Sequence, residues 1–325
     1  MSIRRILPVI ALVLSAVPAR GQLLKDIDML LKNNQARQVY DTTYIFRPQE
    51  RFLIRTQSLF SSENLILDGQ TASDGDFAID VSSLFQYRQT IGIGYRSIVL
   101  DVGFIPGKQK SAGLELKVNG NRIGVSAGGS ISFGMTGTAT QRGVTTPVPE
   151  LSLVGLHAYF NAYYAFNGKR FSMPAATNQN YRQRRSAGSP LATLSAQVYG
   201  VAPNPDTIPD SPVSSIITSL LGLGGGYGYN WVPTDHWLIH LSLTETVGFL
   251  NNSSIRLADD SQIRFEQEVP IFVTAGNVAV LYYWRKWYFG LHAKADHLLF
   301  YGKKDLTFSL NRINSVANLT VGVRF

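Results

Sequence analysis

Apolar residues alternate with small or polar residues over most of the chain, and this two-residue period constrains the fold more than any other feature. In residues 122–133, for example, Ile123, Val125 and Ile131 alternate with an arginine, glycines and serines. The side chains of a β-strand point alternately to opposite faces, so each such segment predicts a strand with one apolar and one small or polar face. The chain is therefore expected to be an all-β protein.

Twelve segments of this kind follow residue 50, and they are long enough to cross a bilayer as tilted strands. They cover residues 51–60, 84–95, 97–105, 111–119, 122–133, 151–166, 188–199, 218–231, 237–250, 271–284, 287–300 and 306–325. An even number of strands places both termini on the same side of a membrane. The pattern thus predicts an antiparallel transmembrane β-barrel of about twelve strands, with ten and fourteen strands as the alternatives.

Alternation also occurs in soluble two-sheet sandwiches, so three further features favour the membrane. Aromatic residues lie at strand ends, where a barrel has its interfacial girdles, for example Trp231, Trp237, Trp284 and Trp287. Short turns tend to alternate with long polar connections, which we expect to be loops at residues 61–83, 134–150, 200–217 and 251–270. The chain ends on an alternating segment and Phe325, as many outer-membrane barrels do.

Composition excludes several classes of protein. Cysteine is absent, so the chain has no disulfide framework, thiolate metal site or lipoprotein anchor. Charged residues make up only 16% of the chain, against roughly 25% in an average soluble domain. The mean hydropathy of +0.01 is too low for a helical membrane protein. The formal charge of +8 comes without a basic run interleaved with aromatic residues, so no nucleic-acid partner is expected.

The first 21 residues resemble a signal peptide, with Arg4 and Arg5 before a short apolar core and Ala19-Arg20-Gly21 at the cleavage site. Residues 22–50 form a periplasmic N-terminal helix and linker, because leucines and isoleucine repeat at helical spacing between residues 23 and 38. Residues 51–325 form the barrel. Export through a cleaved signal peptide and location in the cell outer membrane are the resulting expectations.

The densest polar cluster, residues 177–189, is the candidate binding site. Guanidinium groups suit phosphate and carboxylate, so an anionic small molecule or a lipid headgroup is the predicted ligand. The residues that would bind it are Gln179, Arg182, Arg184, Arg185 and Ser186. A solvated loop, or arginines paired with acidic residues of the lumen, is the structural alternative. The segment 170–187 is also long enough to plug the barrel.

Two other sets of residues are candidates inside the lumen. His292, Lys294 and Asp296 share one face of a strand and are expected to form a polar network. Ser126 lies in a G-x-S-x-G pattern and, with His157, is the weak candidate for a hydrolase. That chemistry needs a sharp strand-to-helix turn, whereas the alternation runs straight through this segment, which favours small lumen-facing residues. No motif for a metal ion or cofactor is present.

Three stretches together resemble a domain-of-unknown-function (DUF) family of exported outer-membrane proteins of Gram-negative bacteria, over roughly residue 40 to the end. They are Tyr40-Asp41-Thr42-Thr43-Tyr44-Ile45, then Phe85-Gln86-Tyr87-Arg88 with Gly92-Ile93-Gly94-Tyr95, and Lys169-Arg170-Phe171-Ser172-Met173 through Asn178-Gln179-Asn180 and Gln183 to Ser186-Ala187-Gly188-Ser189. Met173-Pro174 departs from the tyrosine–arginine-like pair expected there. The resemblance implies a membrane barrel and no known activity.

The sequence therefore predicts an outer-membrane barrel that is either a narrow channel for transport or a structural barrel with a polar lumen. The alternatives are an outer-membrane hydrolase acting on lipid and a soluble secreted β-sandwich that binds a ligand. The expected partners are outer-membrane lipid and the barrel-assembly machinery.

Overall fold

The computed structural model divides the chain into two units, Met1–Val39 and Tyr40–Phe325. It describes residues 29, 33, 39–71, 75–83, 86–105, 111–141, 143–204, 213–257, 260–265, 271–303 and 306–325. The predicted signal peptide and most of the predicted N-terminal helix lie outside the described residues. Within that helix, Met29 and Asn33 are helical and exposed.

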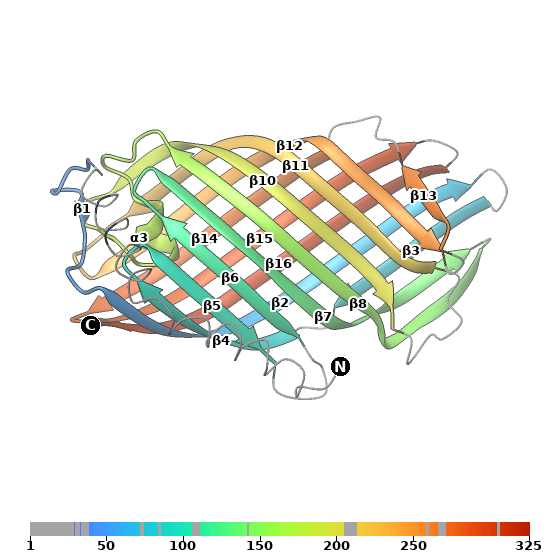
Figure 1. Ribbon diagram of the computed structural model, residues 1–325, viewed down its shortest axis with the longest axis horizontal. Coiled ribbons are helices and arrows are strands. Elements are labelled where there is room, and N and C mark those ends of the chain that lie inside the picture. Colours follow the sequence, from blue (N-terminus) through green and yellow to red (C-terminus); the bar gives the residue numbers. More distant parts are fainter. Residues whose placement is uncertain are drawn as a thin grey trace. The chain divides into compact units, whose positions relative to one another are not determined.

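Residues 40–325 contain a closed antiparallel barrel (Figure 1). Its ring consists of β2 (Phe52–Thr71), β4 (Gln86–Tyr95), β5 (Ile98–Phe104), β6 (Ala112–Asn119), β7 (Ile123–Gln141), β8 (Val144–Ala165), β10 (Ala187–Pro203), β11 (Val213–Trp231), β12 (Trp237–Leu257), β14 (Ile271–Trp284), β15 (Trp287–Lys303) and β16 (Leu306–Arg324). Each strand pairs with the next one, and β16 pairs with β2 to close the ring. The predicted barrel of about twelve strands is confirmed.

The prediction that the long connections are loops is largely wrong, because many of their residues continue the strands. β3 (Gly75–Ser83) pairs with both β2 and β7, and β13 (Gln262–Phe265) pairs with β12. Hairpins are held by backbone hydrogen bonds, so a hairpin extending beyond the bilayer needs no apolar face. The sequence signal for membrane strands therefore stops before the strands do.

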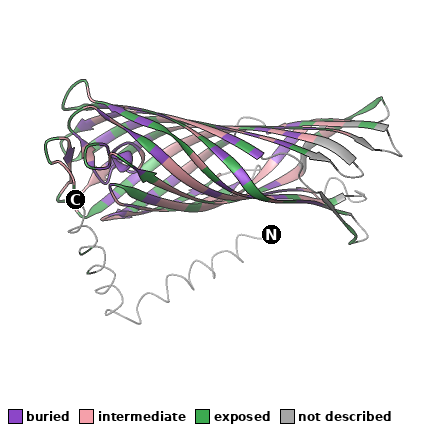
Figure 2. Cartoon of the chain, turned by 90° about the horizontal axis from the view of Figure 1, so that it is seen from above, coloured by how far each residue is buried: buried purple, intermediate pink, exposed green. Residues whose placement is uncertain are grey.

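Burial alternates along the strands (Figure 2). The exposed side chains face outward, on the opposite side of the sheet from the residues that line the lumen. The outward side chains are largely apolar: Ile93 and Leu243 are 59% and 62% exposed. Polar side chains such as Asp101 and His240 are buried in the lumen. This distribution suits a barrel surrounded by lipid. It also excludes the soluble sandwich, since the large sheet closes on itself and the other sheet among the described residues consists of only two short strands, at residues 45–46 and 182–183.

The described residues contain no helix with the length and apolar character that a membrane-spanning helix needs.

Apolar side chains close the lumen toward the end with the long hairpins. They come from strands on several sides of the ring and form one buried cluster, which we call the apolar collar. The apolar collar consists of Leu65, Leu67, Val81, Met135, Tyr199, Val201, Leu220, Ile271, Val273, Leu298, Phe300 and Leu310.

Residues 170–186, between β8 and β10, occupy the opposite end of the lumen, and we call this segment the plug. It contains α3 (Met173–Thr177) and β9 (Arg182–Gln183), which pairs with β1 (Ile45–Phe46). By its sequence, the segment 171–181 could also have paired as a strand, but it contains α3 and no strand residue. Pro174 stands in the first turn of α3, where proline favours a helix and where its missing N–H is not needed. Figure 1 shows α3 at the same end of the barrel as the C-terminus.

Candidate functional site

Hydrogen bonds from the barrel wall hold the plug in the lumen. The Asn230 side-chain amide on β11 donates to the Ser172 carbonyl and to Gln183 Oε1, at 2.9 Å each. The Tyr283 hydroxyl on β14 donates to the carbonyl of Ala175 in α3 at 3.1 Å. The absent side chain of Gly228 on β11 leaves room for the plug, because a Cβ there would lie 2.9 Å from Cζ of Phe171.

Arg55 on β2 connects the plug to the charged residues of the lumen. Its guanidinium is 1% exposed and donates to Gln179 Oε1 at 3.3 Å and to the Thr177 carbonyl at 3.5 Å. Arg55 Nε also donates to Asp101 Oδ1 on β5 at 2.9 Å, and Nη2 contacts the second oxygen of the same carboxylate. Gly92 makes this possible, since a Cβ there would lie 2.6 Å from Arg55 Cγ. Movement of the plug would therefore disturb the Arg55–Asp101 ion pair.

A polar chamber of about 470 Å³ lies between the plug and the apolar collar. On one wall, Lys117 Nζ lies 2.6 Å from Glu115 Oε2 and 3.7 Å from Asp101 Oδ2. Arg88 lies on the same wall across Gly103 and Gly113, whose missing side chains leave space for it.

A second group of charges lies on the wall formed by β2, β15 and β16. Arg312 Nε lies 2.5 Å from Glu63 Oε1, and Nη1 lies 3.3 Å from Asp296 Oδ2. Lys294 Nζ lies 3.7 Å from Asp296 Oδ1, which also accepts a hydrogen bond from Asn314. Of the predicted lumen network, Lys294 and Asp296 therefore lie together. His292 lines the chamber without a direct hydrogen bond or ion pair to either of them among the described residues.

The charges that line the chamber balance. Four cations and four anions of the described residues face it: Arg88, Lys117, Lys294 and Arg312 with Glu63, Asp101, Glu115 and Asp296. Polar uncharged side chains, including asparagines, serines and threonines, surround them. A solute inside would meet both signs of charge in a space that lipid cannot enter.

The structure does not bring Ser126 and His157 together. Ser126 pairs with Asn161 in the β7–β8 ladder, whereas His157 pairs with Ser130. Four ladder positions at about 3.3 Å each separate the two side chains by roughly 13 Å along the strands. β7 continues straight to Gln141, so the strand-to-helix turn that such a nucleophile needs is absent here.

The predicted anion-binding residues do not converge on one point. The Gln179 side chain points to Arg55, and the Ser186 hydroxyl accepts a hydrogen bond from the Val232 amide at 3.0 Å. Arg182 donates to the carbonyl of Asp235 and lies over the Tyr283 ring at 4.9 Å.

The other two arginines of that prediction contact the segment before the barrel. The guanidinium carbon of Arg184 lies 4.6 Å from the centre of the Phe46 ring, and that of Arg185 lies 5.9 Å from the Tyr44 ring. The backbone amide of Arg184 donates to the Tyr44 carbonyl at 2.7 Å. Among the described residues, these arginines therefore join residues 40–46 to the plug, since cations are attracted to ring faces.

Residues 40–46 carry a further contact that sequence reasoning missed. Asp41 Oδ2 lies 3.7 Å from Arg170 Nε, and the Asp41 amide donates to the Lys169 carbonyl at 2.8 Å. Hydrogen bonds from Thr43 are the largest cause that lowers the pKa of the Asp41 carboxyl. The only signal was the resemblance, whose first and third stretches are the two segments that meet here.

A model of a protein family, described as a domain of unknown function, DUF4421, matches residues 39–325. The chain belongs to the DUF4421 family. The closed barrel with its apolar outer face places this DUF4421 chain among outer-membrane barrels. The matched region begins at residue 39, so the DUF4421 domain includes residues 40–46 and the plug as well as the strands.

Solved barrels are similar to the DUF4421 chain at low identity. OmpT of Vibrio cholerae is 9% identical, with a TM-score of 0.30, over 85% of this chain and 99% of that one. The toluene transporter TodX of Pseudomonas putida is 6% identical, with a TM-score of 0.31, over 86% and 91%. OprG of Pseudomonas aeruginosa is 9% identical, with a TM-score of 0.29, over 86% and 98%. No curated protein matches the chain.

Proposed function

We propose that this DUF4421 protein is a gated channel of the outer membrane for small polar solutes, and that the structure represents its closed state. The observation that carries this proposal is the chamber of about 470 Å³, which lies between the plug and the apolar collar. Its volume falls within the range of roughly 300–1,000 Å³ that is common for small-molecule sites. Its balanced charges favour a solute that carries both signs of charge.

The two closures differ in chemistry, and each is of a kind that can open. The plug is attached to the wall by hydrogen bonds from Asn230, Tyr283 and Arg55, whose net stabilisation is about 1 kcal/mol each, and by apolar packing of its own buried side chains against the wall. The apolar collar is held by packing alone, and hydrophobic constrictions can gate a pore by excluding water. A solute would thus pass a closure with polar and apolar contacts on one side and an apolar closure on the other.

A structural barrel is the second candidate, and the ion pairs favour it. Arg312 of β16 contacts residues of its neighbours β2 and β15. Asp101 of β5 contacts Lys117 on the neighbouring β6 and, across β4, Arg55 on β2, so both residues link strands along the lumen wall. A barrel of this kind would keep both closures shut and conduct no ions.

Conductance in planar bilayers distinguishes the two candidates. Three folded barrels are compared: the natural chain, a variant in which residues 171–181 are replaced by a short Gly/Ser linker, and that variant with Phe300→Ser in the apolar collar. A gated channel predicts brief openings, and so a small current, for the first barrel and the largest current for the third. A structural barrel predicts no openings of the first barrel. If the third barrel folds, as judged by its mobility shift on boiling, and carries no more current than the natural chain, the channel proposal is wrong.

Export through a cleaved signal peptide is part of the same proposal. N-terminal sequencing of the protein from the outer-membrane fraction is expected to start at Gln22, and a start at Met1 would contradict cleavage.

A further inference from the structure

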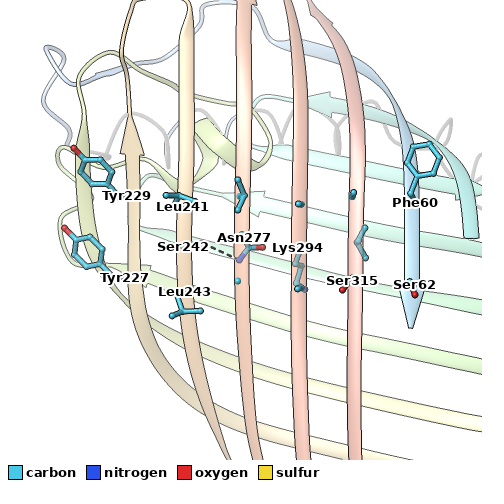
Figure 3. A pocket seen from close by; sticks show the side chains of 16 residues that line it. Phe60, Ser62, Tyr227, Tyr229, Leu241, Ser242, Leu243, Asn277, Lys294 and Ser315 are labelled. Carbon is cyan, nitrogen blue, oxygen red and sulfur yellow. Dashed lines mark hydrogen bonds between the residues drawn. The ribbon is translucent and has the colours of Figure 1, made fainter. Parts of the chain in front are cut away.

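The outer face of the barrel carries a deep groove across β2, β11, β12, β14, β15 and β16 (Figure 3). Its volume is about 740 Å³. Figure 3 shows Tyr227, Leu241 and Leu243 along one side and Phe60 along the other. Small residues form the floor between them: Gly276, Ala293, Ala295, Ser315 and Ala317.

The groove is a real depression in the surface that meets lipid. A Cβ added at Gly276 would meet only Leu243 Cδ1, at 4.0 Å, so the space above this residue is open. An unfilled gap deprives its lining of dispersion contacts, so a flexible hydrocarbon chain is favoured to fill it. The groove lies within the apolar outer face, where the available hydrocarbon is the acyl chain of a membrane lipid.

Polar side chains lie at the end of this groove that is farther from the plug. Glu245 of β12 pairs with Thr274 of β14, which in turn pairs with His297 of β15. The Thr274 hydroxyl donates to Glu245 Oε2 at 2.5 Å, and His297 Nε2 lies 2.9 Å from Asn311 Oδ1 on β16. We call these four residues the polar row. The row faces outward, because Val273, Asp296 and Arg312 next to it are buried in the lumen.

The polar row lies near the outer edge of the apolar band, close to the depth of the lipid esters. Glu245 follows Trp237 by eight residues, which at 3.3 Å per residue and a tilt of about 40° is roughly 20 Å along the membrane normal. The apolar band of such a barrel is about 25 Å tall. Exposed Phe249, Phe272 and Tyr301 lie beyond the row, as expected of an outer aromatic girdle.

The groove and the polar row are continuous. Gly276 and Ala295, in the floor of the groove, pair with each other, two residues nearer the plug than the Thr274–His297 pair. Glu245 is exposed and has no cation within 4 Å among the described residues, so its charge at the lipid surface lacks a protein partner there. Ionisable residues at such positions are costly and usually have a function.

We propose that this surface binds one membrane lipid whose headgroup carries an ammonium group. The acyl chain fills the groove, and the ammonium group pairs with the Glu245 carboxylate, while Thr274, His297 and Asn311 contact the polar atoms near the esters. This site is separate from the chamber and does not depend on the proposed channel.

Native mass spectrometry of the full chain tests the proposal. The protein is reconstituted in vesicles of equal parts phosphatidylethanolamine and phosphatidylglycerol and then released in mild detergent. The natural chain is expected to retain one phospholipid, with about fivefold enrichment of phosphatidylethanolamine, which is ordinary for one exposed ion pair. Ala295→Phe fills the groove and should abolish retention. Ala127→Phe, at an exposed alanine on the outward face of β7 and outside the groove, is the matched control and should retain the lipid.

Glu245→Gln tests the contact with the headgroup separately from the binding of the acyl chain. This variant should still retain a lipid and lose the preference for phosphatidylethanolamine. The proposal is overturned if the natural chain retains no lipid, if Ala295→Phe and Ala127→Phe behave alike, or if Glu245→Gln keeps the preference. Because each variant changes an outward-facing residue, the mobility shift on boiling should be unchanged and verifies that all of them are folded.

Discussion

Asn230→Ala should favour displacement of the plug without unfolding the barrel. Asn230 is fully buried and makes two hydrogen bonds to the plug, to the Ser172 carbonyl and to Gln183 Oε1. A buried hydrogen bond stabilises by about 1 kcal/mol, so the closed plug should lose roughly 2 kcal/mol relative to a displaced one. Since about 1.4 kcal/mol is a factor of ten, the displaced population should rise about 30-fold.

A thiol placed on the plug measures this population. The chain contains no cysteine, so Ala175→Cys puts a single reporter at a fully buried position of α3. When opening and closing are fast, the rate of labelling by a maleimide follows the displaced population. We expect Asn230→Ala to raise that rate about 30-fold over the Ala175→Cys parent.

Asn161→Ala is the matched control for this experiment. Asn161 also lines the lumen and accepts a hydrogen bond from Ser195 at 2.7 Å, but it has no hydrogen bond to the plug among the described residues. Its variant should leave the labelling rate unchanged. Equal rates for the two asparagine variants would refute the view that hydrogen bonds to the wall keep the plug closed.

Three other perturbations test the lumen. Asp101→Leu should destabilise the barrel by about 3–5 kcal/mol, more than Asp101→Leu with Arg55→Met does, because it leaves the buried Arg55 without an ion-pair partner among the described residues, and an unpaired buried charge costs more than the loss of a pair. If the boiling shift occurs at the same temperature in both variants, this prediction is wrong. Lys294→Glu adds negative charge to the chamber, so the reversal potential of a conducting variant should move toward cation preference, and a move toward anions would count against the chamber as the pathway. Burial raises the pKa of Tyr181 in the plug to about 12, so its contribution to plug stability is complete below about pH 10 and is lost as the pH rises through about 12. Labelling of the Ala175→Cys reporter should accelerate in that window, and a rate that stays flat up to about pH 12 would contradict it.

The barrel could be predicted from the sequence because its signal is local. Lipid outside and a polar lumen inside force each membrane strand to alternate, as Ile91 and Ile93 do with Thr90 and Gly92 in β4. Each membrane strand can therefore be recognised from its own residues, without knowing which strands it pairs with. The hairpins beyond the membrane were missed because neither face of them has to be apolar.

The interior could not be predicted in the same way, because it depends on which residues meet across the lumen. Arg55 and Asp101 are 46 positions apart, and Asn230 and Ser172 are 58 apart, so no sequence spacing predicts either contact. The arginines of residues 182–185 were predicted as one anion site, which stays a prediction. In the structure they contact ring faces and a carbonyl, and no spacing in the sequence indicated these contacts.

For the outer groove, too, one part could be predicted from the sequence and the other depends on how the strands pair. Alternation identifies Ala293, Ala295 and Ala317 as outward-facing residues of two strands, as the structure finds them. That their small side chains form one groove, with Glu245 and Thr274 at its end, depends on the register between strands, which backbone hydrogen bonds and the closure of the ring set. A strand's own residues determine which way each side chain points, whereas the pairing of the strands around the ring determines which side chains become neighbours.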